Sequence, residues 1–274
     1  MIHELSKENF NSILRIVHRT WDNIEINAVL AGNNPGWVFA DSPDNPSTAM
    51  VWSKGIKGFY FVGNPENIEF NAHIDKFIDD VIRDRAINSG LSYFEFSGDS
   101  EAWDKSLDKI FGLRDLILSK QCVYKFLNSN WEQYKKASLR ENYQLRGIDK
   151  SLLADKYLKN LDFIWSEILQ WWATIDDFLD NAFGYCIICN NEIVSFCLVS
   201  YVYENTRAIG IETLKDHRRK GLSQFATEAF LSNCIANGFN PYWDCMFTNE
   251  ASRSLAEKLG FYLDHTYSLY EFNF

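Results

Sequence analysis

The chain has 274 residues, with 27 Lys or Arg against 37 Asp or Glu, so its formal net charge is −10. Hydrophobic residues make up 46% and charged residues 23%, a globular composition that excludes disordered and low-complexity classes. The acidic balance argues against a broad electrostatic grip on nucleic acid or on an anionic membrane. The length indicates two domains or one large one.

The first half is predicted to alternate strands and helices. A strand over 2–5 leads into a helix whose apolar face carries Phe10, Ile13, Leu14 and Val17. Three short strands follow at 37–40, 49–53 and 58–62. A second helix has its apolar face at Ile74, Phe77, Ile78, Val81 and Ile82, and it ends near Gly90. A strand over 91–96, a short helix and a strand over 123–127 close this half.

The second half follows a polar linker predicted at 128–142 and repeats the same order. A strand over 143–146 precedes a helix capped by Asp149, and a mainly helical stretch extends to residue 181. Three strands are predicted at 184–189, 193–203 and 207–214, with Asn190 and Asn191 as a hairpin turn. A helix from about residue 222 ends at Gly238. A strand over 242–247, a helix over 249–259 and a strand over 261–274 complete the chain.

This matching order of elements indicates an internal duplication. A short echo supports it, since Ser106-Leu107 precedes Gly112-Leu113 with the same spacing as Ser254-Leu255 precedes Gly260-Phe261. The predicted fold class is α/β (α+β), a mixed twisted sheet flanked by helices. The predicted domains are 1–130 and 141–274.

The cysteines and the N-terminal residues indicate the cellular compartment of the protein. The first residues are polar, so no export signal is expected, and no apolar run approaches the roughly 20 residues of a membrane span. We therefore expect a cytoplasmic protein with reduced, buried cysteines. Cys186 and Cys189 have CxxC spacing, but on a strand they point to opposite faces and favour neither a disulfide nor a metal. No metal is expected.

One basic segment interrupts the acidic chain. Residues 215–220 hold four basic residues and one acidic residue, between a predicted strand and a predicted helix. A helix N-terminus carries free N–H groups and a partial positive charge, so cations placed there favour a bound anion. Gly221 allows close backbone approach and Ser223 adds a hydroxyl, which indicates a phosphate or pyrophosphate site. The alternative is a solvated basic loop. The spacings of dinucleotide-binding loops and P-loops are absent.

The segment Arg218-Arg219-Lys220-Gly221-Leu222-Ser223 resembles the acyl-CoA signature [Q/R]-x-x-G-x-[G/A] of the GNAT acyltransferase superfamily, with Ser at the last small position. Downstream, Asn249, Ser252, Leu255 and the run Lys258-Leu259-Gly260-Phe261 are similar to the superfamily's N-x-x-[AS]…K-L-G-F segment. The element order of 143–274 also matches. The extra N-terminal half resembles the zwittermicin-resistance-type acetyltransferases. It has no equivalent basic loop, so it would be a degenerate GNAT-like domain beside a catalytic one.

The resemblance implies roles for individual residues. Backbone amides of Arg219, Lys220, Gly221, Leu222 and Ser223 would hold the CoA pyrophosphate, with Arg218 beside it. Asn249 and Ser252 would contact CoA, although Asn249 has an equally good reading as a helix N-cap. The edge of strand 207–214, including Leu214, would pair with the pantetheine amides, and a backbone N–H there would polarise the thioester carbonyl.

Glu212 is the predicted catalytic base, with a surface charge on the strand as the alternative. Glu204, Asp176 and Asp177 suit the binding of a cationic acceptor. The superfamily often has a Tyr general acid at the position of Ala256, so Tyr262, Tyr267 or solvent would have to replace it. The superfamily places its acceptor-side helices where Trp165, Trp171 and Trp172 lie. Aromatic residues at helical spacing are more often core, so we favour a core role over lining of the acceptor cleft.

The leading hypothesis is an N-acetyltransferase that transfers an acetyl group from acetyl-CoA to a primary amine of a small molecule by direct attack. Its expected partner is a small-molecule amine, with no nucleic acid and no membrane, and a homodimer is left open. An aminoacyl-transferase of tandem GNAT type is the second hypothesis, and the net charge of −10 disfavours it. The third is a non-catalytic acyl-CoA-binding module, which Ala256 favours.

Overall fold

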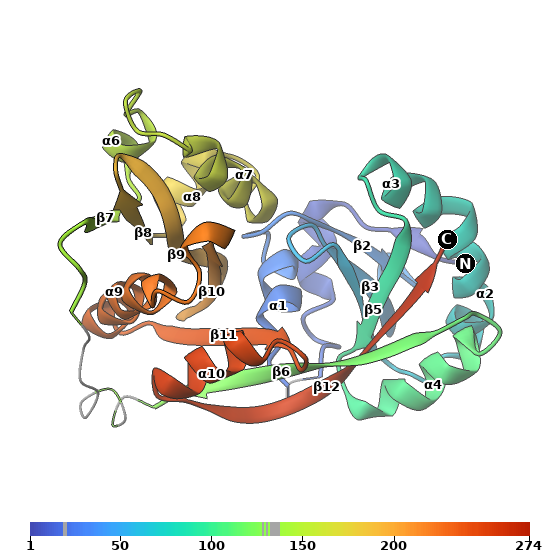
Figure 1. Ribbon diagram of the computed structural model, residues 1–274. Coiled ribbons are helices and arrows are strands. Elements are labelled where there is room, and N and C mark those ends of the chain that lie inside the picture. The colour runs from blue at the N-terminus through green and yellow to red at the C-terminus, as the bar shows by residue number, and fades with distance from the viewer. Residues whose placement is uncertain (19–20, 128, 130, 132–137) are drawn as a thin grey trace. The chain divides into compact units, whose positions relative to one another are not determined.

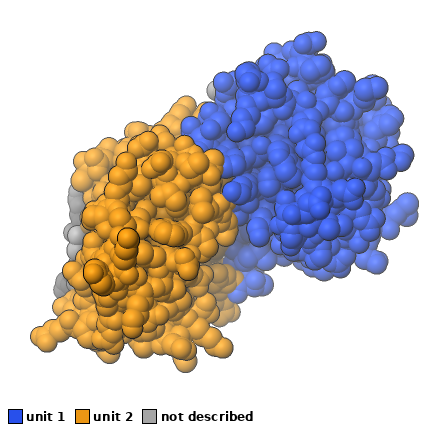
Figure 2. Space-filling view, turned by 90° about the horizontal axis from the view of Figure 1, so that it is seen from above, with its two compact units in different colours: residues 1–122, 246–248, 265–274 blue, residues 123–245, 249–264 orange. Residues whose placement is uncertain are grey.

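The computed structural model describes residues 1–18, 21–127, 129, 131 and 138–274 (Figure 1). The chain forms two compact units, coloured separately in Figure 2. Unit 1 comprises residues 1–122, 246–248 and 265–274, and unit 2 comprises residues 123–245 and 249–264. The predicted linker at 128–142 falls largely on residues outside the described ones. The predicted division into 1–130 and 141–274 stays a prediction.

Unit 1 is a mixed sheet with helices. In chain order its elements are β1 (His3–Glu4), the 3-10 helix η1 (Lys7–Ser12), α1 (Ile24–Leu30), β2 (Gly36–Ala40), β3 (Thr48–Ser53), β4 (Gly58–Gly63), α2 (Ile68–Phe77), the π turn η2 (Ile78–Ile82), α3 (Arg83–Asn88), β5 (Tyr93–Gly98), α4 (Glu101–Phe111) and the start of β6 (Ile117–Phe126). The strands β1 to β4 pair antiparallel in sequence order, and β4 pairs parallel with β5.

Unit 2 repeats this plan. Its elements are β7 (Tyr143–Gly147), α6 (Lys150–Leu153), α7 (Leu161–Trp171), α8 (Ile175–Asn181), β8 (Gly184–Cys189), β9 (Glu192–Tyr203), β10 (Thr206–Thr213), the 3-10 turn η3 (Lys215–His217), α9 (Leu222–Asn237), β11 (Asn240–Met246), α10 (Glu250–Lys258) and the start of β12 (Phe261–Asn273). The strands β7 to β10 are antiparallel, and β10 pairs parallel with β11. In unit 2 the elements follow the order predicted from the sequence, and the predicted mixed sheet flanked by helices is confirmed.

The last strand of the chain completes the sheet of unit 1. Within β12, Tyr270 and Phe272 lie opposite Phe96 and Phe94 of β5 in antiparallel register. The rings of Phe96 and Tyr270 stack with centroids 5.3 Å apart, in a core that α4 closes through Trp103 and Phe111. Aromatic pairs of this kind contribute about 0.5–1.5 kcal/mol beyond their buried area. The C-terminal strand thus supplies core aromatics to a unit whose other strands precede residue 123.

Two elements differ from the sequence prediction. The stretch with Phe10, Ile13, Leu14 and Val17 forms only the short 3-10 helix Lys7–Ser12, and α1 at Ile24–Leu30 was missed. All seven residues of α1 are buried, so the amphipathic period that identifies surface helices is absent. β6 begins at Ile117 rather than at 123. None of its first five residues is buried, so they lack the buried apolar pattern from which the strand was predicted.

All six cysteines are free thiols and buried, as the sequence indicates. Burial raises the pKa of the Cys186 and Cys234 thiols to about 12, so they stay protonated at neutral pH. Among the helices of the described residues, none is both long and apolar enough to cross a bilayer.

Candidate acyl-CoA site

The two parallel strands of unit 2, β10 and β11, are paired at one end and separate further along. β10 and β11 are in register at Thr206, Arg207 and Ala208, opposite Asn240, Pro241 and Tyr242. Within the described part of the chain no further registered pair joins them. Beyond this point Ile211, Glu212 and Thr213 of β10 and Trp243 of β11 line a pocket of about 410 Å³. A pocket of this size is in the range of small-ligand sites.

The floor of this pocket is the loop between β10 and α9. The lining includes Arg218, Arg219, Gly221, Leu222 and Ser223. The backbone is left-handed at Arg219 (φ 61°) and again at Gly221 (φ 77°), which is the N-cap of α9. Left-handed residues in such loops turn backbone amides into a concave anion site, and the helix N-terminus adds partial positive charge. The predicted phosphate loop therefore lines part of the pocket.

The start of α10 forms another part of the lining. Asn249 and Ser252 line the pocket, and Asn249 also caps the helix, because its Oδ1 accepts the Ser252 N–H at 3.1 Å. Trp243, which sequence reasoning missed, donates from Nε1 to the Ser252 hydroxyl at 3.0 Å. Its position depends on β11 running beside β10, a tertiary relation that the local sequence does not carry.

Two predicted cofactor-binding residues do not line the pocket. Lys220 donates its ammonium to the Asp216 carbonyl at 2.8 Å, which closes the basic loop on itself. Leu214 instead donates its N–H to the Val194 carbonyl of β9. These two contacts fix the shape of the loop, and neither residue lines the pocket.

Glu212 and Arg218 meet at the pocket. Arg218 Nη2 lies 2.9 Å from Glu212 Oε1, and Arg218 Nε donates to the Thr213 carbonyl at 3.1 Å. The Arg218 side chain is 60% exposed and the Glu212 side chain 44% exposed, so this ion pair is accessible to solvent and to ions. The predicted base is thus engaged by the first arginine of the predicted phosphate loop.

The predicted general acids are not brought to this pocket. Tyr262 of β12 is 40% exposed in unit 2, and Tyr267 is buried in unit 1, where its ring lies 6.0 Å from that of Trp21. Ala256 is fully buried on α10. The residues lining the pocket include no tyrosine.

The three tryptophans that the resemblance associates with the acceptor side lie in different environments. Trp172 is buried and donates from Nε1 to the Val199 carbonyl at 3.0 Å, so it is core, as favoured. Trp165 is 41% exposed. Trp171 packs edge-on against Tyr201 and donates from Nε1 to Glu167 Oε1 at 2.9 Å. Burial raises the pKa of Glu167, the Trp171 hydrogen bond lowers it, and the charge of Glu212 raises it further.

In unit 1, the parallel strands β4 and β5, which correspond to β10 and β11, stay paired to the end of β4. β4 and β5 pair from Phe59 to Phe61, and the Asp99 N–H continues the pairing to the Phe61 carbonyl. The Asp99 carboxylate then accepts the N–H groups of His18 at 2.8 Å and Gly63 at 3.3 Å. A side chain of the protein itself therefore holds the Gly63 amide at the end of β4, together with the amide of His18. The loop that follows Gly63 has no basic residue, as the sequence indicated.

Comparison with known proteins shows the family and the fold. The model of the GNAT acetyltransferase family matches residues 15–270. The Bacillus subtilis (strain 168) protein named uncharacterized N-acetyltransferase YdfB is 25% identical over 98% of both chains. A GCN5-related N-acetyltransferase-like protein from Streptococcus suis superposes with a TM-score of 0.70 at 22% identity, over 97% of this chain and 99% of that one.

A tandem GNAT protein from the clavulanic acid biosynthesis pathway superposes with a TM-score of 0.60 at 9% identity, over 100% of this chain and 98% of that one. At this identity the likeness concerns the fold. The chain belongs to the GNAT acetyltransferase family.

Proposed function

We propose that the chain transfers an acetyl group from acetyl-CoA to a primary amine of a small molecule. The observation that carries this proposal is the parting of β10 and β11 directly beside the N-terminus of α9. The opened edge of β10 offers backbone groups to an extended chain of amides, while the basic loop at its end suits a pyrophosphate. This combination fits CoA better than a compact phosphate ligand.

The residues present fit CoA at both ends of the pocket. The amides around Gly221 and the guanidinium groups of Arg218 and Arg219 would hold the pyrophosphate, and Asn249 and Ser252 would contact the adjoining arm. A backbone N–H of β10 would stabilise the oxyanion that forms when an amine attacks the thioester. Binding both reactants in one cleft would supply much of the rate by proximity.

The leaving group needs little help. A thiol has a pKa near 8.5, so its anion leaves readily at neutral pH and can take up the proton that the nitrogen loses on becoming an amide. This compensates for the alanine at 256 and for the absence of tyrosine from the lining of the pocket. The cytoplasmic location and a homodimer stay predictions.

The test is calorimetric titration of the purified chain with CoA, followed by an assay of thiol release from acetyl-CoA with 2-phenylethylamine and spermidine as acceptors. Binding of CoA together with amine-dependent thiol release supports the proposal. Absence of CoA binding refutes it. CoA binding without turnover on any primary amine would favour the acyl-CoA-binding module, which the alanine at 256 supports.

A further inference from the structure

The register of β9 and β10 fixes which face of the sheet carries Glu212. Glu212 lies directly opposite Phe196 in the antiparallel pair, so the two side chains share a face. The Phe196 ring packs against Phe163 of α7 with centroids 4.8 Å apart. The next residue, Cys197, faces α9, where Thr227 hydrogen-bonds to it. Glu212 therefore points to the α7 side of the sheet.

Glu167 points to the same side from above. It lies one helical turn after Phe163 and one turn before Trp171, and residues four apart share a helix face. Both neighbours contact β9, Phe163 through Phe196 and Trp171 through Tyr201. Glu167 is therefore aimed at the sheet between two aromatic contacts. Burial raises its pKa, and the charge of Glu212 adds a smaller rise.

One position on this face of the sheet, Gly210, carries no side chain. Gly210 is two residues before Glu212, so it lies on the same face, and its φ is not left-handed. A Cβ at Gly210 would lie 3.4 Å from Leu198 Cδ1 and 3.5 Å from Ser200 Cβ, which is ordinary contact. Neither strain nor crowding therefore demands glycine here. Gly210 is buried between these neighbours, so a larger side chain here would press on the face of the sheet that carries Glu212.

The two carboxylates are differently engaged. Glu212 is held in the solvent-accessible ion pair with Arg218, whereas Glu167 receives one neutral indole hydrogen bond from Trp171. On α8, which packs against α7, Asp176 and Asp180 are exposed and Asp177 accepts the Thr174 hydroxyl at 2.8 Å. Glu167 is thus a half-buried carboxylate on the α7 side of the sheet, and among the described contacts it forms no ion pair.

We propose that the acceptor ammonium binds on the α7 side of β10, between Glu167 and Glu212, and that Glu167 takes its proton. This assignment rests on the proposed function. The ammonium N–H bond breaks and the proton moves to a Glu167 oxygen. The freed lone pair then forms the N–C bond to the acetyl carbon, and the C–S bond breaks. The thiolate leaves with the proton that the nitrogen sheds on becoming an amide, and Glu167 returns its own proton to water.

The chemistry needs a carboxylate that is ionised at neutral pH yet basic enough to accept a proton. The burial that raises the pKa of Glu167 moves it in this direction, and the Trp171 hydrogen bond limits the rise. A cationic acceptor also relieves the repulsion between the two carboxylates. The acceptor class expected is a small cationic primary amine.

The experiment compares Glu167→Gln, Glu212→Gln, Trp171→Phe and Gly210→Val, with Glu141→Gln as a matched control on an exposed glutamate of unit 2. Thiol release from acetyl-CoA is measured against pH with whichever of 2-phenylethylamine and spermidine turns over faster. We expect Glu167→Gln to lower kcat by 10²- to 10⁴-fold, with the Kd for CoA unchanged. Gly210→Val should raise the KM for the amine and leave the Kd for CoA unchanged.

Trp171→Phe separates a role in proton transfer from a purely structural one, because only the former changes the pH dependence of kcat/KM. Loss of the indole hydrogen bond should shift the acid limb of kcat/KM to higher pH. The ¹³C carboxyl resonance of Glu167, assigned by its loss in Glu167→Gln, should titrate above the ordinary range of glutamate without any acceptor. An ordinary midpoint, or a Glu167→Gln enzyme within threefold of the parent kcat, would overturn the assignment. Absence of CoA binding by the parent chain would refute the proposed function instead.

Discussion

Arg218 and Glu212 form an ion pair at the entrance to the gap between β10 and β11, with 2.9 Å between Nη2 and Oε1. The pair lies where the resemblance places the pyrophosphate of CoA, so a phosphate and the Glu212 carboxylate compete for one guanidinium. Binding of the cosubstrate would then release a carboxylate on the acceptor side.

This competition predicts opposite effects for the two partners. Exposed ion pairs are worth about 0–1 kcal/mol, so Glu212→Gln should tighten CoA binding by up to about fivefold. Arg218→Ala should weaken it by about tenfold, because a charge-assisted hydrogen bond to phosphate is lost. Both effects should shrink as salt is raised. Titration calorimetry checks them, and equal weakening by the two variants would contradict the competition.

The left-handed backbone at Gly221 can be tested separately from its size. A Cβ at Gly221 would meet only Phe225 Cε2, at 3.9 Å, but φ is 77°. Gly221→Ala should therefore cost about 1 kcal/mol of loop strain and weaken CoA binding about fivefold. Gly147→Ala is the matched control, since its Cβ meets nothing within 4 Å and its φ is not left-handed. Equal Kd values for the two variants would show that this backbone shape is dispensable.

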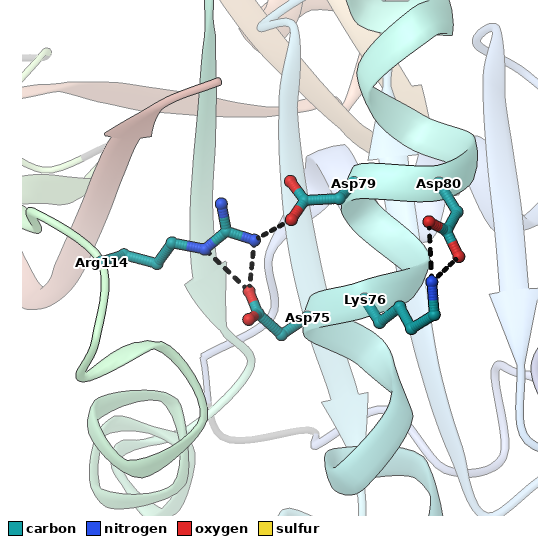
Figure 3. A network of polar contacts seen from close by, with 5 residues as sticks. All are labelled: Asp75, Lys76, Asp79, Asp80 and Arg114. Carbon is teal, nitrogen blue, oxygen red and sulfur yellow. Dashed lines mark hydrogen bonds and ion pairs between the residues drawn. The ribbon is translucent and has the colours of Figure 1, made fainter.

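In unit 1, Arg114 fastens the segment after α4 to the helix that contains the π turn (Figure 3). Its guanidinium lies 2.7 Å from both Asp75 and Asp79 and 4.7 Å from the Phe272 ring centre. Arg114 is only 21% exposed, so Arg114→Ala should lower the free energy of unfolding by about 2 kcal/mol.

Lys76→Ala provides the control for Arg114. Lys76 pairs with Asp80 within the same helical segment, but the two side chains are 80% and 53% exposed. An exposed i,i+4 pair contributes at most about 0.5 kcal/mol. Thermal unfolding of both variants checks the difference, and similar losses would mean that burial of the Arg114 network is unimportant.

Glu95 should give unit 1 a pH-dependent stability. Burial, together with the charge of its cross-strand partner Glu271, raises the pKa of Glu95 from 4.5 to about 7. Folding therefore favours the protonated form, so this contribution is full below about pH 4.5 and is lost as pH rises to about 7. The shift corresponds to about 3 kcal/mol.

Glu95→Gln removes this dependence. Relative to the parent chain, the variant should gain stability between about pH 4.5 and 7 and keep a constant advantage above that range. Thermal midpoints across this range give the measurement, with the exposed Glu66→Gln as control. A parent and a Glu95→Gln variant with parallel pH profiles would be incompatible with the raised pKa.

Much of this arrangement is encoded locally. Alternating apolar strands, the Asn190-Asn191 turn and the Gly238 cap predict their elements because turn chemistry and side-chain period act over a few residues. The basic loop predicts an anion site for the same reason. Trp243 and Glu167 were missed because their roles depend on β11 lying beside β10 and on α7 lying over β9. α1 was missed because a fully buried helix has no polar face to mark its period.

The position of β12 has a consequence for recombination between relatives. Tyr270 and Phe272 at the end of the chain sit in the core of unit 1, opposite Phe96 and Phe94. A hybrid gene with one junction near residue 135 would join the first half of one protein to the closing strand of another, and the aromatic fit in that core would be lost. Successful exchange would need a second junction near residue 265, so that the last ten residues travel with the first half.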